Sequence, residues 1–278
     1  MFNTVDKYAV IGHPVAHSRS PQIHEAFARA TGQQLTYERL PAPLDGFLAT
    51  IDGFAQSGGK GLNVTVPFKL QAFALATAHS PRAKLSGAVN TLKRTGDGWF
   101  GDNTDGPGLV RDITHNLGVA MAGRNVLVLG AGGASRGIMS SVLAERPRSL
   151  TISNRTFAKA VVIAELFEPH GPIAAVPPEA LTGMAFDIVI NATSAGLADK
   201  SPPPWAPSIV ASGAFAYDMI YGDAPTAFLT WAEAHGAART ADGLGMLIEQ
   251  AAESFFIWRG VRPDTASAFP LLRPTGRG

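Results

Sequence analysis

An apolar run that ends in a cluster of glycines limits most strongly what this chain can fold into. Asn125–Leu129 has the length and the β-branched content of a strand that is buried on both faces of a parallel sheet. The segment GAGG follows at 130–133, and apolar residues at helical spacing continue to Leu143. A strand, a glycine turn and a helix N-terminus with unpaired N–H groups together make a binding site for phosphates. This segment predicts a Rossmann-type unit that binds a dinucleotide, although Ser135 replaces the last glycine of the G-x-G-x-x-G pattern.

The next strand indicates which dinucleotide to expect. Leu150–Ser153 is a short strand-like run, and an NAD site needs Asp or Glu near this point to accept hydrogen bonds from the ribose hydroxyls. Asn154 stands there instead, followed by Arg155 and Lys159, while Thr156 is placed to cap the next helix. Cations in the first turn of a helix oppose the helix dipole, so their presence needs a reason. A 2′-phosphate supplies that reason, and these residues favour NADP(H) over NAD.

Composition excludes several other classes of protein. A chain of 278 residues is long for one core, so two domains are expected, and 46% hydrophobic with 16% charged residues is typical of globular α/β proteins. The net charge of +1 gives no electrostatic reason to expect a nucleic-acid or membrane partner. The chain has no cysteine, and two prolines keep His13, His17 and His24 from sharing one helix face. No metal site is therefore expected.

Near the N-terminus, two serines form a candidate ligand site. Tyr8–Gly12 predicts a first strand, and the helix that follows is expected to start at Pro21 with Ser20 as its N-cap. In extended chain the side chains of Ser18 and Ser20 point the same way. They are therefore candidates to hold a polyhydroxylated ligand, while capping alone is the alternative for Ser20.

Polar residues on one face of a later strand lead to a second candidate site. Asn63 and Thr65 share that face, opposite the apolar valines that alternate with them. Pro67 is then expected to open a helix that carries Leu70, Phe73 and Ala76 or Thr77 on one side.

Lys69 is the first candidate for catalysis. It falls in the first turn of the predicted helix, where the dipole disfavours a cation and a carboxylate partner is needed. The polar loop Asp102–Gly108 can supply that carboxylate. A solvated surface lysine is the alternative, and the polar groups before the helix favour the site.

Further strands and a last helix complete the pattern. Phe186–Asn191 and Phe215–Tyr221 read as additional buried strands, and Thr193 follows the first of them, where the carboxyl edge of a sheet would line a cofactor. Met246 and Gln250 lie four residues apart on a predicted helix and share a face.

Together these segments resemble the shikimate dehydrogenase family, and the resemblance covers nearly the whole chain. The matching motifs, in the family's order and approximate spacing, are GHPVAHSRSP, NVTVPFK, GAVNT, GDNTDGPG, GAGGASRG, NRTFAK, NATSAG, YDMIYG and DGLGMLIEQA. The resemblance implies an α/β fold with an N-terminal substrate domain at 1–105 plus 241–278. It also implies a Rossmann-type, parallel-sheet domain that binds NADP at 106–240, with a cleft between the two.

The resemblance also assigns roles to individual residues. The family's catalytic lysine and aspartate fall on Lys69 and Asp105. Its substrate contacts fall on Ser18, Ser20, Asn63, Thr65, Asn90, Tyr221 and Gln250. Its cofactor contacts fall on Gly130, Ala131, Gly132, Gly133, Ala134, Ser135, Asn154, Arg155, Thr156, Lys159, Thr193 and Met246.

The activity implied is the reversible reduction of 3-dehydroshikimate to shikimate with NADPH. Lys69 is placed to meet the charge that develops on the carbonyl oxygen. One alternative is a quinate/shikimate dehydrogenase that uses NAD, which Arg155 and Lys159 disfavour. Another is a non-catalytic NADP-sensing module, which would be expected to lose Lys69 or Asp105. We further expect a monomer or homodimer. A cytoplasmic location is expected because the first residues lack the pattern of a signal peptide.

Overall fold

The chain forms two compact units in the computed structural model, which describes residues 5–96, 98–193 and 203–273. Unit 1 comprises Met1–Gly108 and Leu247–Gly278, and unit 2 comprises Leu109–Met246. These divisions lie a few residues further along the chain than the boundaries expected after residues 105 and 240. The last part of the NATSAG motif, residues 194–196, lies outside the described residues.

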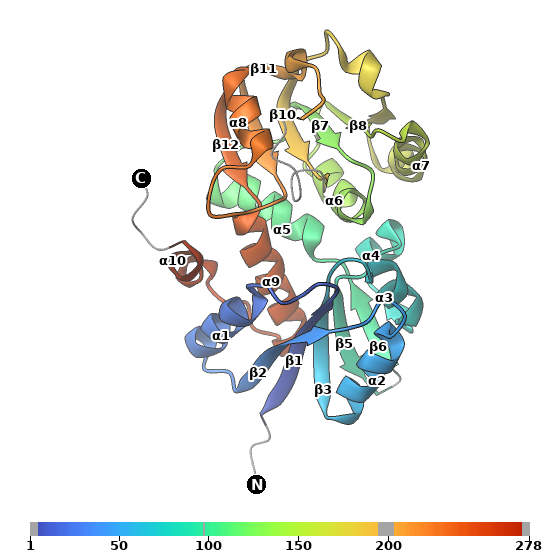
Figure 1. Ribbon diagram of the computed structural model, residues 1–278, viewed down its shortest axis with the longest axis vertical. Coiled ribbons are helices and arrows are strands. Elements are labelled where there is room, and N and C mark those ends of the chain that lie inside the picture. The colour runs from blue at the N-terminus through green and yellow to red at the C-terminus, as the bar shows by residue number, and fades with distance from the viewer. Residues whose placement is uncertain (1–4, 97, 194–202, 274–278) are drawn as a thin grey trace. The chain divides into compact units, whose positions relative to one another are not determined.

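Unit 1 is built on a mixed six-stranded sheet in the order β2-β1-β3-β5-β6-β4 (Figure 1). Its strands are β1 Asp6–Gly12, β2 Leu35–Pro41, β3 Gly59–Val64, β4 Ala78–His79, β5 Thr91–Thr95 and β6 Gly98–Asp102. The strand β1 runs parallel to β2 and β3, whereas β5 runs antiparallel to β3 and β6. The antiparallel part sets Asn63 opposite Thr91, and Thr91 opposite Asp102. Residues from three distant stretches of sequence therefore meet at one level of the sheet.

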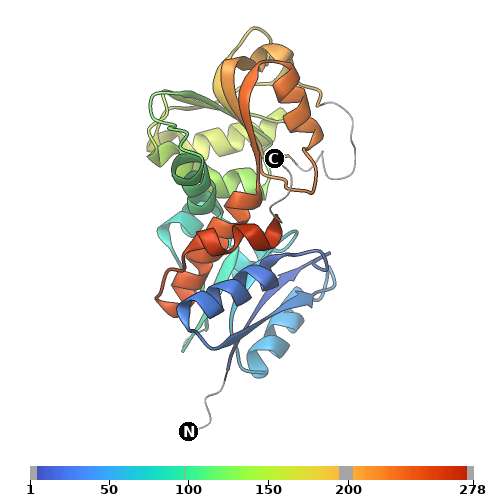
Figure 2. The same cartoon turned by 90° about the vertical axis from the view of Figure 1, so that its left-hand side faces the viewer.

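Helices cover both faces of this sheet (Figures 1 and 2). They are α1 Ser20–Thr31 and α9 Leu244–Arg259 on one face, and α2 Phe47–Gln56, α3 Lys69–Leu75 and α4 Pro81–Ser86 on the other. The chain also forms α5 Asp105–Arg111, which follows β6, and α10 Phe269–Leu272 near the C-terminus. Alternate residues of β1 face opposite sides, as a strand requires. Ala9 and Ile11 belong to the core that includes α2, while Tyr8 and Val10 pack with Trp258 of α9. The sheet is thus buried on both faces.

Two local predictions for unit 1 are wrong in detail. The helix α1 begins at Ser20 itself with Arg19 in the N-cap position, and the backbone N–H of Ser20 donates to Ser18 Oγ at 3.3 Å. The helix α3 begins at Lys69 rather than at Pro67. Phe73 and Ala76 do pack in the core, together with Ala72, whereas Leu70 is 59% exposed.

Unit 2 contains a six-stranded parallel sheet in the order β12-β11-β10-β7-β8-β9. Its strands are β7 Asn125–Leu129, β8 Ser149–Ser153, β9 Ile173–Ala175, β10 Phe186–Asn191, β11 Val210–Asp218 and β12 Ala237–Asp242. Its α-helices, apart from the ends of α5 and α9, are α6 Gly133–Ala144, α7 Phe157–Phe167 and α8 Ala227–Ala234. The strand order reverses between β7 and β10, which is the place where doubly wound sheets bind their ligands. This topology confirms the Rossmann-type sheet.

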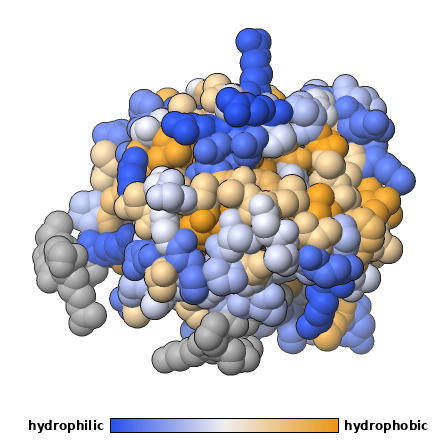
Figure 3. All heavy atoms as spheres, turned by 90° about the horizontal axis from the view of Figure 1, so that it is seen from above, coloured by the Kyte–Doolittle hydropathy of each residue, from blue (hydrophilic) through white to orange (hydrophobic). Residues whose placement is uncertain are grey.

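Among the described residues, no helix is long and apolar enough to cross a membrane. Hydrophilic and hydrophobic residues are interspersed over the described surface that Figure 3 shows.

His24 predicts how the stability of unit 1 depends on pH. It is fully buried, its ring stacks on that of Tyr37 with centroids 4.2 Å apart, and burial lowers its pKa to about 3 although a hydrogen bond with Asn63 opposes the shift. An unfolded histidine titrates near pH 6.5. Between these two pKa values the unfolded chain binds more protons, so stability falls as the pH falls. We expect His24 to account for a loss of about 2 kcal/mol between pH 8 and pH 5, measured by urea unfolding.

The control for this prediction is a ring that cannot titrate. His24→Phe keeps an aromatic ring against Tyr37, so its unfolding free energy should fall less steeply with acid by that amount. His17→Gln replaces an exposed histidine of the same unit and should keep the wild-type slope. Equal slopes for wild type and His24→Phe would contradict the expectation.

Candidate active site and cofactor site

Lys69 and Asp105 form an ion pair within unit 1. The position of Lys69 in the first turn of a helix had predicted a carboxylate partner. Lys69 Nζ donates to Asp105 Oδ2, and the two side chains are 17% and 9% exposed. Each residue is the first of its helix, α3 and α5. A carboxylate at a helix N-terminus is favoured by the dipole and a lysine is not. The aspartate therefore offsets the unfavourable position of the lysine.

Asn90 holds Asp105 from the other side. Its Nδ2 donates to Asp105 Oδ1 at 2.8 Å, and its Oδ1 accepts from the backbone N–H of Thr104 at 2.8 Å. Thr104 Oγ1 in turn donates to Gln250 Oε1 at 3.3 Å. Both oxygens of the Asp105 carboxylate are thus engaged by side chains of unit 1. The candidate residues Lys69, Asp105, Asn90 and Gln250 are brought together.

Asn63 lies at the centre of a second set of hydrogen bonds. Its Oδ1 accepts from Tyr37 Oη at 2.8 Å and from His24 Nε2 at 3.2 Å, and its Nδ2 donates to Ser254 Oγ at 2.9 Å. Ser254 Oγ lies 2.8 Å from Thr91 Oγ1, which donates to Asn90 Oδ1 at 3.0 Å. Asn63 is therefore joined to the Asp105 group through hydroxyls.

The serine pair extends the same network. Ser18 Oγ donates to Ser20 Oγ at 3.1 Å, so the two hydroxyls do face one another. Burial raises the pKa of the Tyr37 hydroxyl well above its ordinary value, and a hydrogen bond with Ser20 opposes that shift. Thr65 lies just beyond the end of β3 and is half-buried, and its backbone N–H donates to Ile11 O at 2.9 Å. A connected series of mostly buried polar groups thus runs from Ser18 to Lys69.

Several residues of this network were not predicted from the sequence. Thr91 and Thr104 lie inside the motifs GAVNT and GDNTDGPG, and Ser254 follows Gln250 by one helical turn, so their spacing carried a signal. No sequence pattern marked His24 or Tyr37, because their contact with Asn63 depends on how α1 and β2 pack on β3. Among the described residues, no cluster of His, Cys, Asp or Glu is arranged to hold a metal ion.

The glycine turn of unit 2 lies at the switch point of the parallel sheet. Gly130 follows β7 with a φ of 106°, and a Cβ there would come within 3.0 Å of Ala192 O and 3.1 Å of Thr193 Cγ2. Only glycine fits this conformation beside the end of β10. Gly132 is the N-cap of α6, and a Cβ on Gly132 or Gly133 would meet no atom of the described residues within 4 Å. The helix N-terminus is open to a phosphate.

The groups around this turn fit a dinucleotide that carries an extra phosphate. Ser135 Oγ and Ser153 Oγ are buried and have no hydrogen-bond partner among the described residues. Asn154 Oδ1 accepts from the backbone N–H of Ala131 at 3.1 Å, which ties the end of β8 to the turn. Arg155 and Lys159 are exposed beside it, with Thr156 as the N-cap residue of α7, although its side chain makes no capping bond.

The remaining candidates of unit 2 are held by the ends of neighbouring strands. Thr193 Oγ1 donates to Asn191 Oδ1 at 2.7 Å, and Asn191 Nδ2 donates to Asp218 Oδ1 at 3.0 Å. Asp218 also accepts from the backbone N–H of Ile220, the residue before Tyr221, at 3.1 Å. Met246 is buried, and its backbone N–H donates to Tyr217 Oη at 3.3 Å.

Three family models match successive parts of the chain. Residues 10–92 match the family described as the shikimate dehydrogenase substrate binding domain, and residues 112–198 match shikimate / quinate 5-dehydrogenase. Residues 243–267 match the shikimate 5'-dehydrogenase C-terminal domain.

Whole-chain comparisons point to the same family. The NADP(+) shikimate dehydrogenase of Aromatoleum aromaticum is 56% identical over 273 residues, which cover 97% of this chain and 98% of that protein. The crystal structure of an Ael1 enzyme from Pseudomonas putida, 47% identical, has a TM-score of 0.90 over 96% of this chain and 98% of its own. Shikimate 5-dehydrogenase of Thermus thermophilus in complex with NADP(H) and shikimate, 34% identical, has a TM-score of 0.84 over 95% and 97%. With this identity along almost its whole length, the chain belongs to the shikimate dehydrogenase family.

Proposed function

We propose that the chain catalyses the reversible reduction of 3-dehydroshikimate to shikimate with NADPH. The observation that carries the proposal is the Lys69–Asp105 pair, which Asn90 anchors inside a network of hydroxyl and amide groups. Similarity to NADP(+) shikimate dehydrogenases at 56% identity supports it. As part of this proposal, unit 1 binds the substrate and unit 2 binds NADP(H), and the enzyme works in the cytoplasm as a monomer or homodimer.

The proposed chemistry assigns Lys69 to the carbonyl oxygen. When bound, NADPH supplies a hydride for the carbonyl carbon, and negative charge then develops on the oxygen. The Lys69 ammonium stabilises that charge and delivers a proton to the oxygen, which yields the hydroxyl of shikimate. Asp105 orients the amine through its ion pair, and Asn90 keeps Asp105 from turning away. In the reverse direction Lys69 takes the proton back.

We propose that the network of unit 1 recognises the rest of the substrate. Shikimate carries a carboxylate and neighbouring hydroxyls, and it therefore needs donors at one end and both donors and acceptors at the other. The hydroxyls of Ser18 and Ser20 offer donors for the carboxylate. The other proposed substrate contacts offer amide, hydroxyl and phenol groups, and they are Asn63, Thr65, Asn90 and Gln250 of unit 1 and Tyr221 of unit 2.

The proposed cofactor contacts are those around the glycine turn of unit 2. The open N-terminus of α6 receives the diphosphate, and the exposed cations Arg155 and Lys159 receive the 2′-phosphate. Thr193 and Met246 are proposed to contact the nicotinamide end. The cations favour NADP over an NAD-dependent quinate/shikimate dehydrogenase, and the intact Lys69–Asp105 pair argues against a non-catalytic sensor.

Replacing the lysine tests the proposed mechanism. Lys69→Ala should lower kcat for shikimate oxidation by about 10²-fold to 10⁵-fold, because it removes both the proton carrier and the charge that stabilises the oxygen. KM for shikimate should change far less, since this contact strengthens mainly in the transition state. Initial rates at saturating NADP measure both constants.

Two further variants complete that test. Asp105→Asn should also lower kcat, and the double variant should be little worse than the worse single one, since the pair acts as a unit. Lys60→Ala removes an exposed lysine from β3 of the same unit and serves as the control. Near-normal turnover by folded Lys69→Ala would exclude this mechanism.

Replacing Arg155 tests the choice of cofactor. Arg155→Ala should raise KM for NADP by about 10-fold to 100-fold, as expected for the loss of a charge-assisted contact to phosphate, and should leave KM for NAD nearly unchanged. Arg148→Ala, an exposed arginine before the amino end of β8, is the matched control, because Arg155 follows the carboxyl end of the same strand. Equal effects of Arg155→Ala on both cofactors would show that Arg155 is structural.

A further inference from the structure

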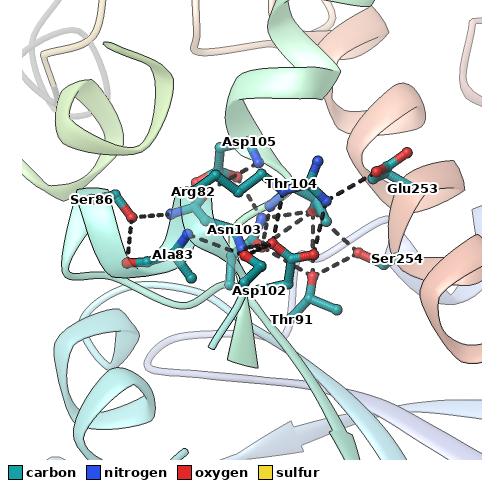
Figure 4. Close-up of polar contacts among 12 residues, drawn as sticks. Arg82, Ala83, Ser86, Thr91, Asp102, Asn103, Thr104, Asp105, Glu253 and Ser254 are labelled. Carbon is teal, nitrogen blue, oxygen red and sulfur yellow. Dashed lines mark hydrogen bonds and ion pairs between the residues drawn. The ribbon is translucent and has the colours of Figure 1, made fainter. Parts of the chain in front are cut away.

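Arg82 joins two segments that carry the candidate catalytic and substrate-binding groups (Figure 4). It lies on α4, and its guanidinium binds both oxygens of Asp102, with Nε 2.7 Å from Oδ1 and Nη2 2.9 Å from Oδ2. The same Nη2 donates to Glu253 Oε1 on α9 at 2.9 Å. A planar fork of this kind fixes the direction of its partners as well as their distance.

On one side the fork reaches the loop that leads to Asp105. Asp102 ends β6, is 5% exposed, and also accepts from Ser80 Oγ and from the backbone N–H of Asn103. Asn103 Oδ1 then accepts from the backbone N–H of Asp105 at 3.1 Å. A movement of the Asp102 carboxylate would therefore be passed to Asp105 through two consecutive hydrogen bonds.

On the other side the fork reaches the helix that carries Gln250 and Ser254. Glu253 precedes Ser254 directly and follows Gln250 by three residues on α9. This helix lies very close to the first turn of α5, because a Cβ on Gly108 would come within 2.7 Å of Gln250 Cβ. The loop and the helix are thus in contact at the candidate site. Arg82 links the same loop and helix without belonging to the site itself.

We propose that Arg82 is a positioning residue for the reaction: by holding Asp102 and Glu253 together it keeps Asp105 against Lys69 and Gln250 beside Thr104. The inference rests on the proposed function, because it concerns the same pair of residues. Within the described part of the chain Arg82 forms no hydrogen bond or ion pair with Lys69 or Asp105, so its effect passes through Asp102.

The experiment compares Arg82→Met with Arg82→Lys. Arg82→Met should lower kcat by about 10-fold to 100-fold, the cost expected when a catalytic group is displaced by about an ångström. KM for NADP should stay within about two-fold, since the proposed NADP contacts belong to unit 2. Arg82→Lys restores the positive charge but not the paired hydrogen bonds of a guanidinium, so it should recover part of the lost kcat. It is also the second variant if Arg82→Met does not fold.

A matched arginine separates positioning from stability. Arg259 of the same unit forms an ion pair with Asp6 and donates to Gln33 Oε1 at 2.8 Å. Both Arg259→Met and Arg82→Met should lower Tm, but Arg259→Met should leave kcat within about two-fold of wild type. Equal losses of kcat in the two variants would overturn the inference.

Two readouts show whether the effect passes through Asp105. In the Asp105→Asn background, Arg82→Met should cause little further loss of kcat, whereas the full loss would mean an independent role. A crystal structure of Arg82→Met should show Asp105 displaced from Lys69 or Asn90, and an unmoved pair would overturn the inference whatever the substrate. Failure of the wild type to oxidise shikimate would contradict only the proposed function.

Discussion

The double anchoring of the Asp105 carboxylate is the interaction on which the candidate site depends. Lys69 and Asn90 each take one of its oxygens, and the three residues come from separate parts of the sequence. They meet because the antiparallel pairing of β3, β5 and β6 brings Asn63, Thr91 and Asp102 to one level of the sheet. The strands β3 and β6 end at this edge of the sheet, and β5, which runs the other way, begins there. The segments that carry the site therefore start or end beside one another.

Sequence reasoning predicted the features that depend on neighbouring residues. The strand, glycine turn and helix from Asn125 to Leu143 were recognisable because each step needs a particular residue type at a fixed offset. The buried residues of α3 were not recognisable in the same way, because the apolar residues of so short a helix are compatible with more than one buried face. The contacts of Arg82 and His24 also escaped, since they join segments that only the folded sheet brings together.

In unit 2 the register of the parallel sheet organises the loops. Asn191, Asp218 and Asp242 stand side by side at the ends of β10, β11 and β12. Burial raises the pKa of the Asp218 carboxyl, although a hydrogen bond from Thr226 opposes that shift most strongly. This buried carboxyl accepts hydrogen bonds from Asn191 at the end of β10 and from Ile220 and Thr226 beyond β11. The segments that carry Thr193 and Tyr221 therefore share one support.

The asparagines of unit 1 are constrained by the direction of their hydrogen bonds more than by their volume. The oxygen of Asn63 receives two donors while its nitrogen donates to Ser254, and the nitrogen of Asn90 donates to a carboxylate. Aspartate has the same size at either position but cannot donate, and at position 90 it would set one negative charge against another. Positions 63 and 90 therefore discriminate between two side chains of equal shape. A design method that scored packing alone would treat them as interchangeable, and it would lose the site while preserving the fold.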